Sequence, residues 1–214
     1  LVVIEAEAAA GWSARSFPTL EDWRARRDLF SDVAAVRGRV RFRVIAGDRT
    51  TLVEAVEVTE NFPTLLGGPA LPPDLWRATP QGQDVAFVLL ARGRARPLAD
   101  EAAAGPRTLR TSEGRTVRIA GVLPPSFVFP TVRATSPIDA LVPFTPGAVI
   151  ESLSGSMTQE LAVVARLQPG VPVEAVAGAL APKPAATQAL ALTVRSMSAY
   201  LTAHLRPVAA GAVA

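Results

Sequence analysis

The sequence predicts an α+β protein in two parts, with many short strands and a few short helices. Apolar runs with the period of two that is typical of strands recur along the chain, and amphipathic helical segments separate some of them. Their order is βαβ-like near both ends and rich in hairpins in the middle. Nineteen prolines and 15 glycines indicate frequent turns. We therefore expect a first domain that is split in sequence by a smaller α/β insertion.

The first part of the chain predicts a strand, a helix and a hairpin. Leu1–Glu5 is a short apolar run suited to a buried strand. Thr19 is placed to cap a helix whose apolar stripe includes Trp23 and Phe30, so Trp23 is expected in the core. Gly47–Arg49 is predicted to be the turn of the hairpin that follows. The predicted strands of this region are 33–36, 40–45 and 51–59.

The middle of the chain predicts short elements around a candidate boundary. Glu60–Gly68 predicts a single helical turn, and the Pro-rich stretch Leu71–Gln83 lacks periodicity and is the clearest boundary. A buried strand at 85–90 and a weak helix at 91–104 follow, and Pro97 is expected to interrupt that helix. The segment 109–117 predicts a hairpin that turns at Glu113 and Gly114.

The stretch Arg115–Pro130 reads RTVRIAGVLPPSFVFP. Apolar and polar residues alternate in its first half, which predicts a strand. This strand is expected to end at Pro124, because a proline cannot donate to a strand ladder. An apolar loop follows where a solvated turn would be expected, so we predict an interaction surface there. The alternative, equally favoured, is that this loop fills the core between the subdomains. The loop consists of Phe127, Val128, Phe129 and Pro130.

The last part predicts strands at 140–144, 161–167 and 190–194, together with two helices. Pro172 suits the first turn of a helix with Val173, Val176 and Leu180 on its apolar face. Ser198 is predicted to cap the last helix. The chain opens in a predicted strand and closes on an apolar tail, so we expect a soluble piece of a longer protein.

The basic residues are almost all arginines, and they do not predict a nucleic-acid surface. Of 22 basic residues only Lys183 is a lysine, and the formal net charge is +3. Phe42 is the only aromatic residue within the one notable cluster, whereas nucleic-acid surfaces combine clustered cations with aromatics. The cluster alternates along one face of a predicted strand and consists of Arg37, Arg39, Arg41 and Arg43. We expect no nucleic-acid partner.

The sequence offers no convincing active site. There is no cysteine, and His204 is the only histidine, so thiol chemistry and His-based metal clusters are excluded. Neither a phosphate-binding glycine loop nor a nucleophile elbow is present. Glu54 and Glu57 lie on opposite faces of one strand and are interpreted as solvated sheet charges. We predict no catalytic, cofactor-binding or metal-binding residues, and no enzyme activity.

Four stretches in one order resemble a known family. They are SFPTLEDWRARRDLFSDVAAV at 16–36, VTENFPTLLG at 58–67, TVRIAGVLPPSFVFP at 116–130 and LAVVARLQPGVPVEAVAGAL at 161–180. This series resembles the MacB-type periplasmic core domain of FtsX-like ABC-transporter permeases. Pro63 stands where the family usually has a second aromatic residue, and the helix around Pro97 is shortened.

The resemblance implies a split porter-like α/β subdomain with an inserted smaller α/β subdomain. Residues 1–68 and 140–214 would be porter-like, 69–139 would be the insertion, and the tail would lead into a membrane helix. The resemblance also implies a non-catalytic extracytoplasmic domain of a permease in the bacterial inner membrane, which couples helix motion to substrate export or force transmission.

The same resemblance implies three kinds of partner. These are a separate or fused cytoplasmic ATPase, a second permease subunit in a dimer, and a periplasmic partner protein. The alternative function is an extracytoplasmic module that binds a small molecule or peptide in a cleft between two subdomains. An enzyme is the third hypothesis, and it would require acidic residues gathered around His204.

Overall fold

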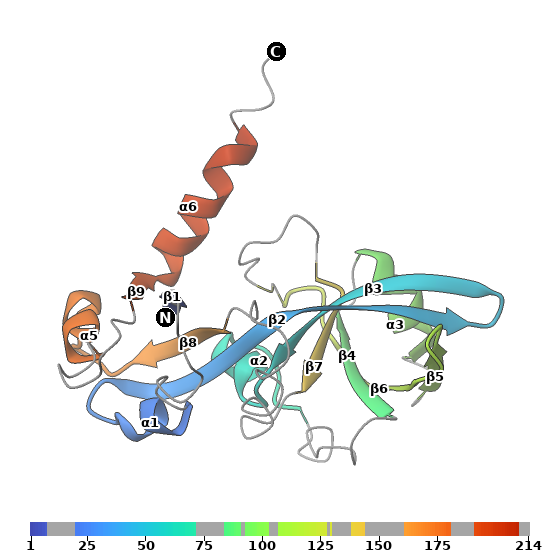
Figure 1. Cartoon of the computed structure of the whole chain (residues 1–214), viewed down its shortest axis with the longest axis horizontal. Coiled ribbons are helices and arrows are strands. Elements are labelled where there is room, and N and C mark those ends of the chain that lie inside the picture. The colour runs from blue at the N-terminus through green and yellow to red at the C-terminus, as the bar shows by residue number, and fades with distance from the viewer. Residues whose placement is uncertain are drawn as a thin grey trace. The chain divides into compact units, whose positions relative to one another are not determined.

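A computed structural model describes residues 1–7, 20–71, 84–90, 93–102, 107–127, 129, 138–143, 161–180 and 191–209 (Figure 1). These residues form a sheet-rich mixed structure, which confirms the predicted α+β class.

The chain divides into two compact units. Unit 1 comprises Leu1–Val36 and Val149–Ala214, and unit 2 comprises Arg37–Ala148. The chain passes from unit 1 to unit 2 within one strand, β2 (Phe30–Ala46). The porter-like and inserted subdomains predicted to meet near residues 68 and 140 are not tested by this division and stay a prediction.

Unit 1 is built on a split βαβ arrangement. Strand β1 (Val2–Glu7) lies between β8 (Leu161–Leu167) and β9 (Ala191–Ser196) and is antiparallel to both. Strands β8 and β9 therefore run parallel to each other, and helix α5 (Val173–Leu180) connects them. This agrees with the βαβ-like order predicted for the ends of the chain. The first half of the middle strand is buried, since Val2, Val3 and Ile4 are at most 1% exposed.

Helix α1 (Leu20–Ala25) is shorter than predicted. Trp23 is 3% exposed, as expected of a core residue, but Phe30 begins β2 instead of ending the helix. The helical spacing of Phe30 is overridden by pairing at the end of β8, where the Leu29 carbonyl accepts the Gln168 N–H at 2.9 Å. Thr19, the predicted cap, lies outside the described residues.

Two further helix predictions need correction. Pro97 does not interrupt a helix: α3 (Arg96–Ala102) begins beside it, where a missing N–H costs little, after the 3-10 turn η3 (Gly93–Ala95). Helix α6 (Met197–Ala209) is capped by Ser196 instead of Ser198, because the Ser196 hydroxyl accepts the Ala199 N–H at 3.2 Å. Ser198 lies inside the helix.

The described part of unit 2 contains six strands that run in mixed directions (Figure 1). Its order is β3-β7-β4-β6-β5-β2, and a further pairing of β3 with β2 joins the two ends of this order. The pairs β3–β7 and β4–β6 are parallel, whereas β4–β7, β5–β6 and β2–β5 are antiparallel. The strands are β3 (Arg49–Val58), β4 (Asp84–Leu90), β5 (Arg107–Thr111), β6 (Thr116–Leu123) and β7 (Ala140–Pro143).

The core of unit 2 lies against η3 and α3. Strand β2 runs through Gly38 without a break, although the sequence predicted two strands there. Phe42 and Val44 point into the core while Arg41 and Arg43 are exposed, as the alternation predicted. The buried cluster is Phe42, Val44, Val53, Ala55, Leu89, Ala95, Leu98, Ala99, Val117, Ile119, Ala140 and Val142.

The hairpin turns and the short helix of unit 2 form where the sequence predicted them. Gly47 at the β2–β3 turn and Gly114 at the β5–β6 turn have positive φ angles of 62° and 80°, which glycine adopts at low cost. Helix α2 (Phe62–Leu65) is a single turn that buries Phe62 and Leu65. None of the helices in the described part of the chain is long and apolar enough to span a membrane.

Candidate functional site

The apolar loop after β6 was the one predicted interaction site, and its two phenylalanines are buried. Phe127 is 5% exposed and Phe129 is 4% exposed. The Phe127 N–H donates to the Pro124 carbonyl at 2.9 Å, so a tight turn follows β6 directly. Val128 and Pro130 lie outside the described residues.

Both rings pack against the segment around α2. The Phe129 ring lies 5.5 Å from the ring of Phe62, centroid to centroid, with a tilt of 37°. The Phe127 ring covers Gly68 so closely that a Cβ there would meet its Cδ2 at 2.7 Å. These two side chains therefore pack inside unit 2, and filling of a core between the subdomains stays a prediction. Contact with a partner protein stays a prediction.

A pair of buried carboxylates that sequence reasoning missed lies between β3 and β7. Glu54 is 2% exposed and Asp139 is 1% exposed, although their sequence positions are 85 residues apart. The Asp139 N–H donates to the Glu54 carbonyl at 2.8 Å, and Asp139 Oδ2 accepts the Glu54 N–H at 3.0 Å. The interpretation of Glu54 as a solvated sheet charge is therefore wrong.

Each carboxylate is approached by an arginine from the solvent side. Arg41 Nε donates to Glu54 Oε1 at 2.8 Å, and Arg94 Nε lies 3.8 Å from Asp139 Oδ2. The two arginines are 68% and 48% exposed, so their charges are solvated while those of the carboxylates are not. Glu54 Oε2 is buried and has no hydrogen-bond partner among the described residues. Such an orphan oxygen costs stability unless it is protonated or meets a cation.

Burial raises the pKa of Asp139 above its ordinary value of 3.8, and the negative charge of Glu54 adds to this rise. The Glu54 N–H bond and the positive charge of Arg94 oppose it. These contacts link β3, the start of β7 and η3. The Asp139 carboxyl is the group of this site that can hold a proton. The site does not resemble a metal centre, since no group of three or more potential ligands occurs within the described residues.

No local pattern in the sequence predicts that these two carboxylates are buried together. Glu54 is flanked by Val53 and Ala55, and Asp139 by Ile138 and Ala140, so each acid sits within a buried apolar run. The burial of one carboxylate depends on a strand from a distant part of the sequence, and no local period encodes that pairing.

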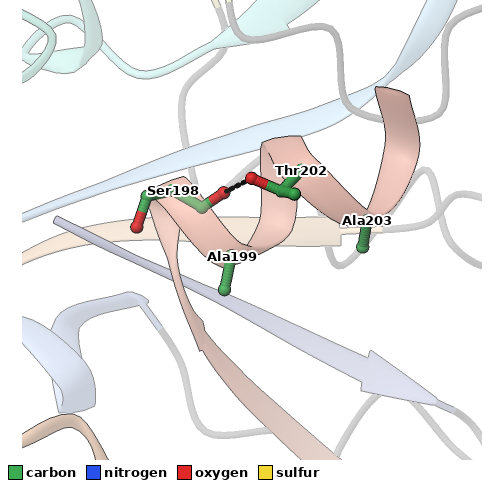
Figure 2. Close-up of a pocket in the computed structure, with 4 residues that line it drawn as sticks. All are labelled: Ser198, Ala199, Thr202 and Ala203. Carbon is green, nitrogen blue, oxygen red and sulfur yellow. Dashed lines mark hydrogen bonds between the residues drawn. The ribbon is translucent and has the colours of Figure 1, made fainter. Parts of the chain in front are cut away.

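The described residues do not show the acidic cluster around His204 that the enzyme hypothesis requires. His204 lies in α6, but its side chain is outside the part of the structure that is described. A shallow depression of about 440 Å³ lies along α6 beside Ser198, Ala199, Thr202 and Ala203. Figure 2 shows that the Thr202 hydroxyl donates to the Ser198 carbonyl, at 2.8 Å, so this hydroxyl is engaged by its own helix.

A second open depression of about 440 Å³ lies in unit 2 beside the β2–β3 turn. Its lining residues are Ile45, Gly47, Thr108, Leu109, Arg110 and Thr116. Among the described lining residues there is no acid or histidine, and the two threonine hydroxyls are the only potential nucleophiles. The two depressions therefore give no support to the enzyme hypothesis.

Comparison with known proteins gives matches to solved structures. The periplasmic region of MacB from Actinobacillus actinomycetemcomitans matches with a TM-score of 0.56 and 12% identity, over 100% of this chain and 94% of that one. A domain assigned to a permease protein of Porphyromonas gingivalis matches with a TM-score of 0.55 and 16% identity, over 90% of this chain and 86% of that one.

This chain has the MacB-type periplasmic domain fold. Neither a protein-family model nor a curated protein sequence matches it. The extracellular domain of the noncanonic ABC-type transporter YknZ from Gram-positive bacteria is also similar, with 14% identity over 77% of this chain and 83% of that one, at a TM-score of 0.46. The resemblance predicted from the four sequence stretches is confirmed at the level of the fold.

Proposed function

We propose that this chain is a non-catalytic extracytoplasmic domain of an ABC-transporter permease subunit. The observation that supports this most is the MacB-type fold, which matches the periplasmic region of MacB over the whole chain. The four motifs found in the same order in the sequence support it independently. The proposed location is the bacterial inner membrane, with this domain on its periplasmic or extracytoplasmic side.

The proposed mechanism is mechanical coupling of membrane-helix motion to export or force transmission. Support comes from the junction between β1 and α6 in unit 1, where the Met197 N–H donates to the Leu1 carbonyl at 3.0 Å. Tyr200 of α6 is fully buried, and its hydroxyl donates to Glu5 Oε1 at 3.4 Å. Strand β1 and helix α6 would therefore move together, and motion applied to either of them would move unit 1 as a rigid body.

The proposed architecture keeps the porter-like and inserted parts that the resemblance implies. The split βαβ arrangement of β1, β8, α5 and β9 supports a porter-like part. The partners proposed are a cytoplasmic ATPase, fused or separate, a second permease subunit and a periplasmic protein. This domain would contribute no group to ATP hydrolysis, which the ATPase would perform.

The experiment uses the full-length protein that contains this chain, purified in lipid nanodiscs together with any ATPase that it retains. A fluorescent dye is attached at Thr202→Cys, an exposed position of α6, and its signal is followed when a non-hydrolysable ATP analogue is added. The proposal predicts retention of an ATPase and a nucleotide-dependent signal. The signal should persist in Tyr200→Phe, which keeps the ring, and fall in Tyr200→Ala, which removes the packing between α6 and β1.

Two results would contradict this proposal. Absence of any retained ATPase activity would contradict the permease assignment. An unchanged signal in Tyr200→Ala would contradict coupling through the β1–α6 junction. Circular dichroism of each variant shows whether the domain remains folded, and Ala199→Ser, an exposed change on the same helix, serves as the control.

A further inference from the structure

The outer face of β2, β5 and β6, opposite the core of unit 2, has three arginines around an exposed isoleucine. Ile45 is directly opposite Arg110 in the β2–β5 ladder, and Arg110 is directly opposite Thr116 in the β5–β6 ladder. Side chains at directly opposed positions share one face and lie about 5 Å apart. We name this face the Arg110 surface, and its members are Arg43, Ile45, Thr108, Arg110, Thr116 and Arg118.

Arg43 and Arg118 lie on the same face, because side chains alternate between the two faces along a strand. Arg43 lies two residues before Ile45 in β2, and Arg118 lies two residues after Thr116 in β6. Arg118 is also directly opposite Thr108 in the β5–β6 ladder. The neighbouring residues of opposite orientation, Val44 and Val117, belong to the core.

The arginines of this surface have no ion-pair partner of their own within the described residues. Arg41 binds Glu54 and Arg49 binds Glu101, but neither an ion pair nor a side-chain hydrogen bond joins Arg43, Arg110 or Arg118 to a described side chain. Arg43 and Arg110 are exposed, and Arg118 is half-buried. Ile45 is 39% exposed, which is unusual for a large aliphatic side chain in the described part of the protein.

Among the described residues, the acids nearest in sequence and register lie at the borders of the surface. Glu113 lies in the β5–β6 turn, where the hydrogen bond from the Ser112 hydroxyl, at 2.8 Å, lowers the pKa of Glu113 most and the charge of Arg43 adds a smaller effect. Asp84 is placed opposite Thr116 by the β4–β6 register. The centre, formed by Ile45 and Arg110, therefore has a positive charge, and Asp84 lies at the border beside Thr116.

We propose that the Arg110 surface binds an acidic segment of a partner protein. A planar guanidinium matches a carboxylate through paired hydrogen bonds, and the Thr108 and Thr116 hydroxyls can donate to further carboxylate oxygens. Ile45 gives the open depression an apolar floor for an aliphatic side chain between two acids. An acidic segment with an aliphatic side chain matches both the arginines and Ile45, whereas the headgroups of an anionic bilayer match only the arginines.

This inference does not depend on the permease function. An arginine cluster with carboxylates only at its described borders favours association by charge complementarity, which also selects against basic partners. Of the arginines that alternate along β2, Arg43 belongs to this surface, whereas Arg41 binds Glu54.

The test measures binding of the whole chain to a synthetic peptide in which glutamates flank a central leucine. The same peptide with glutamine in place of each glutamate is the first control, and vesicles of phosphatidylglycerol in phosphatidylcholine are the second. Binding is followed by fluorescence anisotropy at about 150 mM salt, where distant charges are screened. The variant combines Arg43→Gln, Arg110→Gln and Arg118→Gln. The matched control combines three arginine changes outside the surface: Arg27→Gln, Arg96→Gln and Arg195→Gln.

The proposal expects the glutamate peptide to bind, and the surface variant to weaken this binding by about tenfold or more. It expects the control variant, which loses the same charge, to change binding by less than about twofold, because none of its three sites belongs to the Arg110 surface. Ile45→Glu, a single change at the centre, should abolish binding by repulsion even if the triple variant folds poorly. Equal losses in the two triple variants, no peptide binding, or binding to the vesicles alone would each overturn the proposal.

Discussion

Glu54 and Asp139 are joined by two hydrogen bonds, one from each backbone N–H. The Asp139 N–H reaches the Glu54 carbonyl at 2.8 Å, and the Glu54 N–H reaches Asp139 Oδ2 at 3.0 Å. This exchange fastens the start of β7 to the centre of β3. It uses a carboxylate where an ordinary strand pair would use a second backbone carbonyl, so the Asp139 side chain takes the place of one ladder bond.

Asp139→Ala is expected to destabilise the protein by about 1–3 kcal/mol. The change leaves the buried Glu54 N–H without an acceptor, and an unsatisfied buried donor has a cost of this order. The measurement is urea unfolding of the chain at neutral pH. Asp100→Ala is the control, since Asp100 is 71% exposed and pairs only loosely with Arg96, and it should have little effect. Equal effects of the two changes would contradict the role assigned to Asp139.

The raised pKa of Asp139 predicts how stability depends on pH. Between the ordinary value of 3.8 and the raised pKa, the folded state binds this proton more tightly than the unfolded chain does. The Asp139 contribution to the free energy of unfolding therefore falls as pH rises through that window, and it is largest below it. The lowered pKa of exposed carboxyls such as Asp28 works in the opposite direction at low pH.

Asp139→Asn isolates this contribution, because asparagine keeps an acceptor oxygen and cannot titrate. We expect the Asn variant to gain stability relative to the original protein as pH rises from about 3 to 7, measured by thermal unfolding at each pH. Glu54 and Arg94 face Asp139 and remain in both proteins, so their own effects largely cancel in the difference. A difference that is constant across this range would show that Asp139 titrates normally.

Gly68→Ala and Gly178→Ala should change stability in opposite directions. A Cβ at Gly68 would lie 2.7 Å from Phe127 Cδ2 and 2.9 Å from the Pro63 carbonyl, so we expect a loss of about 1–3 kcal/mol from overpacking. Gly178 lies in α5 with nothing within 4 Å of its added Cβ, so alanine should stabilise that helix by about 0.5–1 kcal/mol. Thermal unfolding of both variants is the measurement. A neutral Gly68→Ala would mean that Phe127 does not cover Gly68.

The apolar loop is predicted to contribute to stability through Phe129. Removing its ring in Phe129→Ala should cost about 3–5 kcal/mol, since the ring is buried against Phe62. Phe129→Leu, which keeps most of the volume, is the matched control and should cost less. Urea unfolding of the isolated chain measures both. A loss below about 1 kcal/mol for Phe129→Ala would favour partner contact over core filling.

Local signals predicted the strands and turns well, because each depends on a few neighbouring residues. The alternation of Arg41, Phe42, Arg43 and Val44 fixes which face of β2 is buried, and Gly114 fixes the turn between β5 and β6. The same rules failed where a distant contact decides the outcome. Phe30 has helical spacing from Trp23, but pairing beside β8 draws it into a strand.

The candidate site was the least predictable part. Burial of Phe127 and Phe129 follows from packing against α2, and burial of Glu54 follows from Asp139. Both contacts join segments far apart in the sequence, so the local pattern allowed a solvated Glu54 and an exposed loop equally well. The resemblance to MacB-type domains predicted the fold. Several motifs in a fixed order carry information about how distant segments are arranged, whereas local periodicity does not.

The central claim, an extracytoplasmic domain of a permease, is tested most directly by where this chain lies in the cell. The chain has no cysteine, so Ser112→Cys in the exposed β5–β6 turn provides a single reporter within it. Spheroplasts that produce the full-length protein are treated with a membrane-impermeant maleimide, with the unsubstituted protein as the control. The proposal predicts labelling of Ser112→Cys in intact spheroplasts. Labelling only after the membrane is lysed would place the domain in the cytoplasm and contradict it.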